Sequence, residues 1–105
     1  MSRIKIRITD KALADMNAIH DYIAENLQVP DMAIKQYNRI ADGIESLDEY
    51  PKRCRLFESY PERDLGYMRL LIDNYSVIYV AGDECVTVLR VLHSSSDIIT
   101  RLRDG

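Results

Sequence analysis

The chain has 105 residues, a formal net charge of −3, 47% hydrophobic residues and 30% charged residues. This length and balance predict a single domain over residues 1–105 and argue against a membrane protein or a disordered chain. No apolar run approaches the roughly 20 residues of a membrane-spanning helix. The N-terminus alternates charged residues with isoleucine and does not resemble a secretory signal, so we expect a cytoplasmic protein.

The cysteines and histidines are too few and too scattered to predict a metal site. Cys54, Cys85, His20 and His93 show no ligand-like spacing, and in a reducing compartment the two thiols should stay unpaired. We therefore expect neither a metal nor a cofactor. The net negative charge argues against a broadly basic surface for nucleic acid and leaves a local cationic patch as the alternative.

The first predicted elements are a strand and a helix. Residues 3–8 alternate isoleucine with lysine and arginine, the period of a half-buried strand. Thr9 or Asp10 then offers an N-cap oxygen for a helix. That helix should run from residue 10 to about residue 27, because apolar residues recur every three or four positions: Leu13, Met16, Ile19, Ile23 and Leu27.

A second helix is predicted from about residue 31 to residue 50, with Pro30 before it and Pro51 ending it. Gly43 lies inside this helix at a cost of roughly 1 kcal/mol relative to alanine, and we expect close packing against the first helix to explain it. The short connection predicts an antiparallel hairpin that packs on a sheet. Its buried stripe is expected to comprise Ile34, Tyr37, Ile40, Ala41, Ile44 and Leu47.

The second half of the chain predicts a loop and an antiparallel meander. Residues 52–66 show no period and indicate a long ordered loop, a feature that is often functional. Strands are expected over residues 67–72, 75–81 and 85–92, because turn-forming pairs separate them. From residue 94 we expect a short helical turn after Ser95 or Ser96 and then a frayed end.

These elements together predict an α+β fold of order β-α-α-β-β-β, with an antiparallel helical hairpin packed on a small, mostly antiparallel sheet. The far face of the sheet, or its edge, is then free for a partner or ligand. A domain this small with 47% hydrophobic residues also leaves apolar area to cover. We therefore expect the open sheet face and the hairpin to present an apolar surface to a partner.

Three segments carry a family resemblance: Gly66-Tyr67-Met68-Arg69-Leu70, Tyr75-Ser76-Val77-Ile78-Tyr79 and Leu89-Arg90-Val91-Leu92-His93. An arginine in the first meander strand, a Tyr-x-x-x-Tyr strand and a closing Arg-Val-x-His resemble the end of RelE/ParE toxins, the plasmid-stabilisation type of toxin in type II toxin–antitoxin modules. Tyr22-Ile23 and Tyr50-Pro51 in the helices fit the same pattern. The resemblance covers nearly the whole chain.

The resemblance implies a RelE/ParE-like fold, growth arrest by the free toxin and neutralisation by a cognate antitoxin protein. It implies that operator DNA is contacted only indirectly, through the antitoxin. Two activities occur in the superfamily. RelE-like members cleave mRNA in the ribosome, whereas ParE-like members inhibit DNA gyrase by binding, with no known chemistry of their own.

Cleavage of RNA through the 2′-hydroxyl needs a base, positive charge at the phosphate and an acid for the leaving oxygen. The candidate catalytic residues are Arg69, Arg90 and His93. The two guanidinium groups suit a phosphate, and the histidine titrates near neutral pH. Glu58 or Glu62 is a further candidate base. We expect the fold to gather the two arginines and the histidine near one rim.

Four further residues are candidates for contacting the antitoxin or the target: Arg55, Glu58, Tyr75 and Tyr79. The tyrosines could stack on a nucleobase. Most candidates also have a structural alternative: an ion pair for Arg69 or Arg90, a solvated loop cluster for Arg55, a hydrogen-bonded strand end for the histidine, and core packing for the tyrosines, which share one strand face.

Ser76 is a departure from the nuclease pattern. Many mRNA-cleaving members have an arginine directly after the first tyrosine of the third strand, and here Ser76 stands in that place. The lysine pair of some ribosome-dependent members is also absent from the preceding strand. Together with the negative net charge, this favours a ParE-like toxin that acts by binding. The alternatives are a ribosome-dependent mRNA endonuclease of RelE type and a non-toxic interaction domain or operon co-repressor partner.

Overall fold

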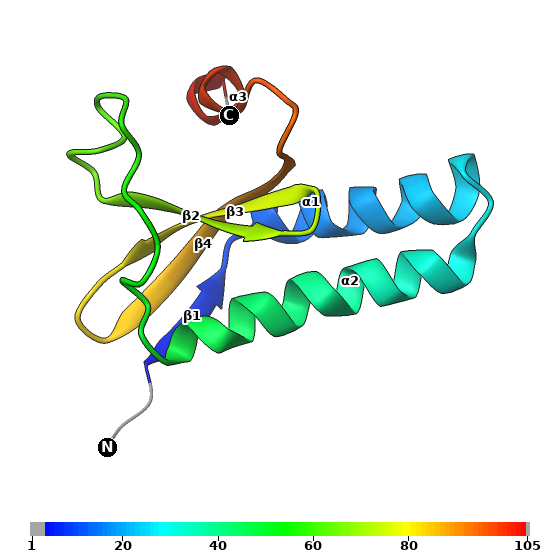
Figure 1. The fold of residues 1–105 in the computed structure, drawn as a ribbon, viewed down its shortest axis with the longest axis horizontal. Helices are drawn as coiled ribbons and strands as arrows, with labels where there is room; N and C mark the ends of the chain where they lie inside the picture. The colour runs from blue at the N-terminus through cyan, green and yellow to red at the C-terminus, as the bar shows by residue number, and fades with distance from the viewer. Residues whose placement is uncertain (1–3, 105) are drawn as a thin grey trace.

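The computed structural model describes residues 4–104, in which two antiparallel helices lie on one face of a four-stranded sheet (Figure 1). This confirms the predicted α+β fold. None of the helices over residues 4–104 is long and apolar enough to cross a bilayer. Arg3, which begins the predicted first strand, lies outside the described residues. The elements are β1 (Lys5–Ile8), α1 (Asp10–Asp21), α2 (Pro30–Glu45), β2 (Tyr67–Ile72), β3 (Tyr75–Ala81), β4 (Cys85–His93) and α3 (Ile98–Asp104).

The sheet has the strand order β1-β4-β3-β2. Strands β2, β3 and β4 form the predicted antiparallel meander, and β2 and β3 have the predicted bounds. Strand β1 joins parallel to β4, with Ile6 beside Val86 and Ile8 beside Val88. The sheet therefore has two edges, one formed by β1 and the other by β2.

Helix α1 begins at the predicted cap. The hydroxyl of Thr9 accepts a hydrogen bond from the Ala12 amide at 3.1 Å and donates one to the Leu89 carbonyl at 3.0 Å, which ties the start of α1 to β4. The helix is continued by a π-helical turn over Tyr22–Asn26. This turn lies near the tip of the hairpin, which extends beyond the sheet (Figure 1).

Helix α2 ends earlier than predicted. It stops at Glu45, a 3-10 turn follows over Ser46–Asp48, and the chain has left the helix before Pro51. The guanidinium of Arg53 donates to the carbonyls of Ser46 and Glu49 at 3.0 and 3.1 Å. These bonds satisfy carbonyl groups that a helix end leaves open.

Gly43 is a point of close packing, and the contact is with β2. The predicted close packing against α1 is wrong. A Cβ at this position would collide with the side chain of Ile72 and would also touch Leu70. The absence of a side chain therefore lets α2 approach the sheet closely.

A β-bulge in β4 decides which side chains face the helices. Ile78 pairs with Arg90 but Tyr79 pairs with Val88, so Leu89 is an extra residue. The residues of β4 that face the main core are consequently Val86, Val88 and Val91, and Arg90 turns to the opposite side. The main core comprises Ala12, Met16, Ile40, Ile44, Leu47, Met68, Val77, Tyr79, Val86, Val88 and Val91.

The far face of the sheet is not entirely open. A second cluster of buried residues, Ile78, Leu92 and Ile98, is packed against Phe57 and Leu102 among others. The C-terminal segment thus forms a seven-residue helix that packs on the sheet, and the predicted frayed end is wrong for the described residues. The apolar residues of α3 explain this, because they cover the far face next to the 52–66 loop.

We expect Gly43→Ala to lower the free energy of unfolding by about 1–3 kcal/mol, the usual cost of overpacking a core, although alanine is the better helix former. Combining it with Ile72→Val should recover part of the loss, because valine lacks the terminal carbon that the new Cβ meets. Chemical denaturation of both single variants and the double variant measures this coupling. A more stable Gly43→Ala protein would contradict the close approach.

Candidate functional site

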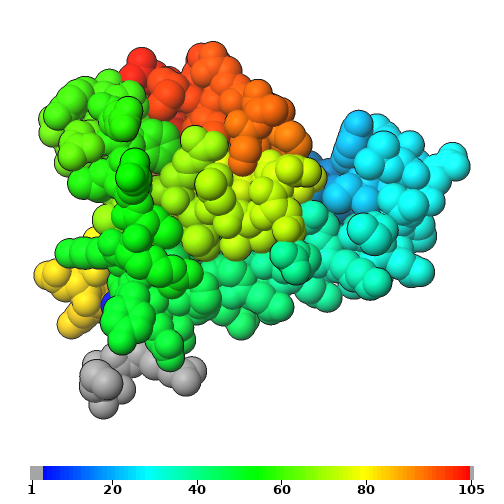
Figure 2. Space-filling view, viewed as in Figure 1, coloured from blue at the N-terminus to red at the C-terminus, as the bar shows by residue number. Residues whose placement is uncertain are grey.

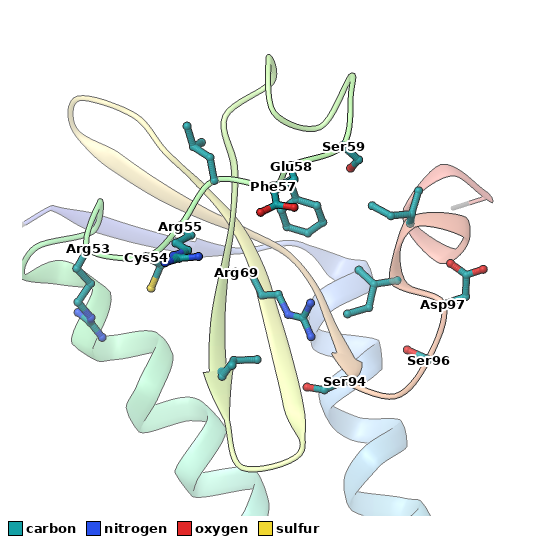
Figure 3. A pocket seen from close by; sticks show the side chains of 14 residues that line it. Arg53, Cys54, Arg55, Phe57, Glu58, Ser59, Arg69, Ser94, Ser96 and Asp97 are labelled. Atoms are coloured by element: carbon teal, nitrogen blue, oxygen red, sulfur yellow. The ribbon is translucent and has the colours of Figure 1, made fainter.

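A groove of about 910 Å³ lies between the 52–66 loop and the segment that leads into α3 (Figure 3). This volume is within the range of small-molecule sites. Arg69 and Leu71 line it from β2, and in Figure 2 the β2–β3 hairpin reaches the surface between the loop and the C-terminal segment. We call this the loop–tail groove. Its other apolar lining residues are Leu56, Phe57, Ile98 and Ile99.

Arg69 is the cation that the sheet directs into the loop–tail groove. Its Nε donates to the hydroxyl of Ser76 on β3 at 2.8 Å, and that hydroxyl lies 2.9 Å from the hydroxyl of Ser94. Ser76 is completely buried; its hydroxyl accepts from Arg69, and either serine hydroxyl can be the donor in the bond between Ser76 and Ser94. Only Nε is used within the described chain, so both terminal nitrogens of Arg69 can bind an anion.

Four other charged side chains line the loop–tail groove, and two of them are already engaged. Arg53 donates to backbone carbonyls at the end of α2. Asp97 accepts hydrogen bonds from the first turn of α3, which lower its pKa. In residues 4–104 neither Arg55 nor Glu58 has a hydrogen-bonded or ion-paired partner for its side chain. The free charges of the groove are therefore Arg55, Glu58 and Arg69.

Arg90 is occupied elsewhere. Its Nε and a terminal nitrogen donate to the carboxylate of Asp15 at 2.7 and 3.0 Å, and the two side chains are only 14% and 13% exposed. The same carboxylate accepts from the Val91 amide at 2.9 Å, and Arg90 also donates to the Arg101 carbonyl at 3.3 Å. The hydrogen bond with Asp15 raises the pKa of Arg90. The predicted structural alternative was an ion pair, and Arg90 forms one with Asp15. The residue also joins α1, β4 and α3.

His93 ends β4 on the helical side of the sheet. It pairs with Tyr75 of β3, and the two rings meet edge to face with centroids 5.4 Å apart. The Ser95 amide donates to Nδ1 of His93 at 3.1 Å, so the neutral ring carries its proton on Nε2 in this arrangement. Burial raises the pKa of Tyr75. Because this pair packs beside the main core, His93 faces away from Arg69.

Tyr79 is part of the core. It is completely buried, its hydroxyl donates to the Pro51 carbonyl at 2.7 Å, and burial raises its pKa. A completely buried ring cannot contact a partner, so the predicted binding role does not apply to Tyr79. Its role is to hold the start of the 52–66 loop against the sheet.

Glu62 is an anchor for α3 and not a free base. Its carboxylate accepts from Arg103 at 3.0 and 3.1 Å and from the hydroxyl of Ser59 at 2.8 Å, and the residue is 3% exposed. These hydrogen bonds, that of Arg103 first, lower the pKa of Glu62 to about 2. A carboxylate with such a low pKa is a poor acceptor for a proton near neutral pH, so the candidate role as a base is not supported.

The structure brings together only part of the predicted site. Arg55, Glu58 and Arg69 line one groove, whereas Arg90 and His93 lie elsewhere, so the expected gathering of both arginines and the histidine at one rim is wrong. The predictions missed the partners that decide this: Asp15, Ser76, Ser94 and Arg103. Asp15, Ser94 and Arg103 are distant in the chain from the groups that they contact, so no spacing signal links them, whereas Ser76 is only seven residues from Arg69 across the β2–β3 hairpin.

A helical hairpin packed on a small, mostly antiparallel sheet is the fold of RelE/ParE-like toxins. Residues 6–98 match the family model described as the ParE toxin of the type II toxin–antitoxin system parDE. The chain belongs to this family of toxins.

The most informative relatives agree with this assignment. The chain is 33% identical over 87 residues to Toxin RelE2 of Caulobacter vibrioides, covering 83% of this chain and 91% of that protein. The chromosomal ParDE system from P. aeruginosa has a similar fold, with a TM-score of 0.72, 22% identity and coverage of 87% and 96% of the two chains. The archaeal RelE–RelB complex from Pyrococcus horikoshii gives a TM-score of 0.61 at 14% identity, over 90% and 98% of the two chains.

Replacing Arg90 with alanine should lower the free energy of unfolding by about 3 kcal/mol, because it leaves the mostly buried Asp15 carboxylate without its cation. Arg39→Ala is the control: it breaks an ion pair with Asp73 in which the arginine side chain is 65% exposed, and its effect should be small. Urea denaturation of both variants makes the comparison. Equal stability of the two would show that Arg90 is not a structural residue.

Stability should also depend on pH through Glu62. The pKa of Glu62 is about 2 in the fold, below the ordinary value of 4.5. Its contribution to the free energy of unfolding is therefore present above pH 4.5 and is lost as the pH falls towards 2. The melting temperature should fall over this interval less in Glu62→Gln than in the wild type. Asp64→Asn, at an exposed neighbouring carboxylate, should follow the wild-type profile.

Proposed function

We propose that this toxin acts by binding its target, in the manner expected of ParE-like members, with DNA gyrase as the first target to test. The placement of the three candidate catalytic residues carries the proposal. Arg69 faces the loop–tail groove, whereas Arg90 is paired with Asp15 and His93 packs on the helical side of the sheet. An arginine can bind an anion, but cleavage also needs proton transfer at the same place.

An mRNA endonuclease is the second candidate, because one observation favours it. Arg55, Glu58 and Arg69 line the same groove, which combines two guanidinium groups with a carboxylate that has no partner in the described chain. Glu58 could serve as a base and the arginines could hold a phosphate. This arrangement does not use His93, so it differs from the cleavage mechanism expected from the sequence.

We also propose a cognate antitoxin as the protein partner. Related folds were solved as toxin–antitoxin complexes, among them RelBE2 from Mycobacterium tuberculosis, with a TM-score of 0.58 and 19% identity over 88% of this chain and 99% of that chain. The hairpin tip supports the proposal, because it presents exposed apolar residues next to one another in the chain. These are Tyr22, Leu27, Val29, Met32 and Ile34, each between 40% and 56% exposed.

Purified protein should inhibit DNA supercoiling by gyrase and leave mRNA on programmed ribosomes intact. We expect Arg69→Gln to reduce the inhibition about tenfold, since it removes the charge from the groove, and Arg7→Gln on β1 to have no effect. Cleavage of mRNA at the ribosomal A site that is lost in Arg69→Gln and Glu58→Gln would establish the endonuclease instead.

Expression of the chain alone distinguishes the two toxin activities from the third possibility, a non-toxic interaction domain. Growth should stop on induction, and co-expression of the adjacent gene product should restore it. Undiminished growth at a verified protein level would contradict both toxin activities.

A further inference from the structure

His93 holds the first residues of the C-terminal segment through its ring and its carbonyl. The backbone nitrogen of Ser95 lies 3.1 Å from Nδ1 of His93, and the hydroxyl oxygen of Ser95 lies 2.6 Å from the same nitrogen. The carbonyl of His93 accepts from the amide of Ser96 at 3.0 Å and from its hydroxyl at 2.5 Å. These bonds fix a turn over residues 94–96, which we call the tail turn.

The tail turn forms one wall of the loop–tail groove, because Ser94 and Ser96 both line it. Figure 3 shows Ser94 beside the end of the Arg69 side chain. The hydroxyl of Ser94 is 2.9 Å from that of Ser76, which accepts from Nε of Arg69. The Ser94 amide donates to the Asn74 carbonyl at 2.8 Å, so the turn starts from a fixed point on the sheet. The tail turn therefore affects both the shape of the groove and the support of its arginine.

The protonation state of His93 decides which bonds the tail turn can make. A neutral imidazole has one acceptor nitrogen, whereas a protonated imidazole has two donors and no acceptor. The hydroxyl of Ser95 can rotate and accept from a protonated ring, but the Ser95 amide can only donate. This amide belongs to the peptide plane that joins Ser94 to Ser95, so it can leave Nδ1 only if the plane rotates or the ring moves. Protonated His93 is therefore incompatible with this form of the turn.

The other neighbours of the His93 ring do not compensate for the lost acceptor. Tyr75 on β3 packs against the ring edge to face, and Tyr75 in turn interacts with Tyr22 near the tip of the hairpin. Within residues 4–104 no carboxylate is hydrogen-bonded to or paired with the ring. Asp97, the nearest carboxylate along the chain, accepts from Thr100. A ring that turned away from the amide would also give up its contact with Tyr75.

We propose that His93 is a positioning residue for Arg69, and that its protonation opens the tail turn and weakens anion binding in the loop–tail groove. Histidine is the side chain whose charge ordinarily changes between about pH 5 and 8, so the groove responds to acidification near neutral pH. The inference rests on the proposed function only in taking Arg69 as part of the site that contacts the target. Added positive charge by itself strengthens anion binding, so weaker binding in acid separates the opening of the turn from simple electrostatics.

The first test needs no ligand: an NMR titration of the ¹⁵N-labelled full chain over the pH interval in which histidine changes charge. We expect the amides of residues 94–97 to shift with the same midpoint as the His93 ring. The protection of the Ser95 amide from hydrogen exchange should fall about fivefold, the order expected for one net hydrogen bond. The amide of Val77, which is completely buried in β3, is the internal reference and should not respond.

Substitutions of His93 give opposite expectations. His93→Asn keeps a side-chain oxygen as acceptor but does not titrate, so the tail turn should stay closed at every pH. His93→Ala removes the acceptor, so the turn should be open even at the alkaline end of the titration. Ser95→Ala keeps the backbone amide and should retain the pH response. His20→Asn on α1, at the other histidine, should leave the titration of the turn unchanged.

The second test is the binding of sulfate, an ion whose charge is constant over this pH interval, followed at the Arg69 Nε–H signal. The affinity of the wild type should fall about fivefold towards acid, as expected for the loss of one net hydrogen bond that supports the site. Binding should be insensitive to pH in His93→Asn and weak throughout in His93→Ala. Arg69→Gln should abolish the sulfate response of the groove at every pH.

Three results would overturn the inference. They are a tail turn that titrates equally in His93→Asn, amides of residues 94–97 that do not respond through the midpoint of His93, and wild-type sulfate binding that becomes stronger in acid. The gyrase assay at neutral pH separates this inference from the proposed function. Loss of gyrase inhibition with the pH response of the turn retained would refute the proposed function alone. Inhibition without any pH response of the turn would refute the positioning role of His93 alone.

Discussion

The ion pair between Arg90 and Asp15 is the contact on which the arrangement of the other elements depends. One carboxylate receives both the guanidinium of Arg90 and the amide of Val91, and the same arginine reaches a carbonyl of α3. Helix α1 is thereby fixed to β4 beyond the end of the short strand β1. A mostly buried charge needs its partner, so this contact also removes Arg90 from any role in binding an anion at the groove.

The two arginines of the meander show how strands on either side of β3 give one residue type two different roles. Arg69 and Arg90 stand on the same face of the sheet, each opposite Ile78. Arg90 is at the side next to α1 and finds a carboxylate there, whereas Arg69 is at the outer side and finds the neutral hydroxyl of Ser76. A neutral partner orients the guanidinium without cancelling its charge. The groove keeps a cation although the whole chain has a net charge of −3.

Two segments shape the far face of the sheet: the 52–66 loop, which is irregular, and the C-terminal helix α3. The 52–66 loop is held by Tyr79 and by its pairing with β2, and α3 is held by the ion pair of Arg103 with Glu62. The loop–tail groove is the space that these segments leave over β2. Its lining therefore depends on contacts between the loop and the C-terminal helix as much as on the sheet, and a change in either segment would reshape it.

The sequence by itself determined the order of the elements from β1 to β4, the bounds of β2 and β3, a helix cap at Thr9 or Asp10, and the family. These features follow from local periodicity, turn residues and motif spacing, which act over a few neighbouring residues. Only the tertiary structure decided that Gly43 meets Ile72, that the bulge at Leu89 sets Arg90 opposite Ile78 with Asp15 of α1 as its partner, and that Glu62 is tied to Arg103. The reason is that the partner of a buried charge or of a missing side chain is chosen by which distant segments meet, and local spacing does not encode that choice.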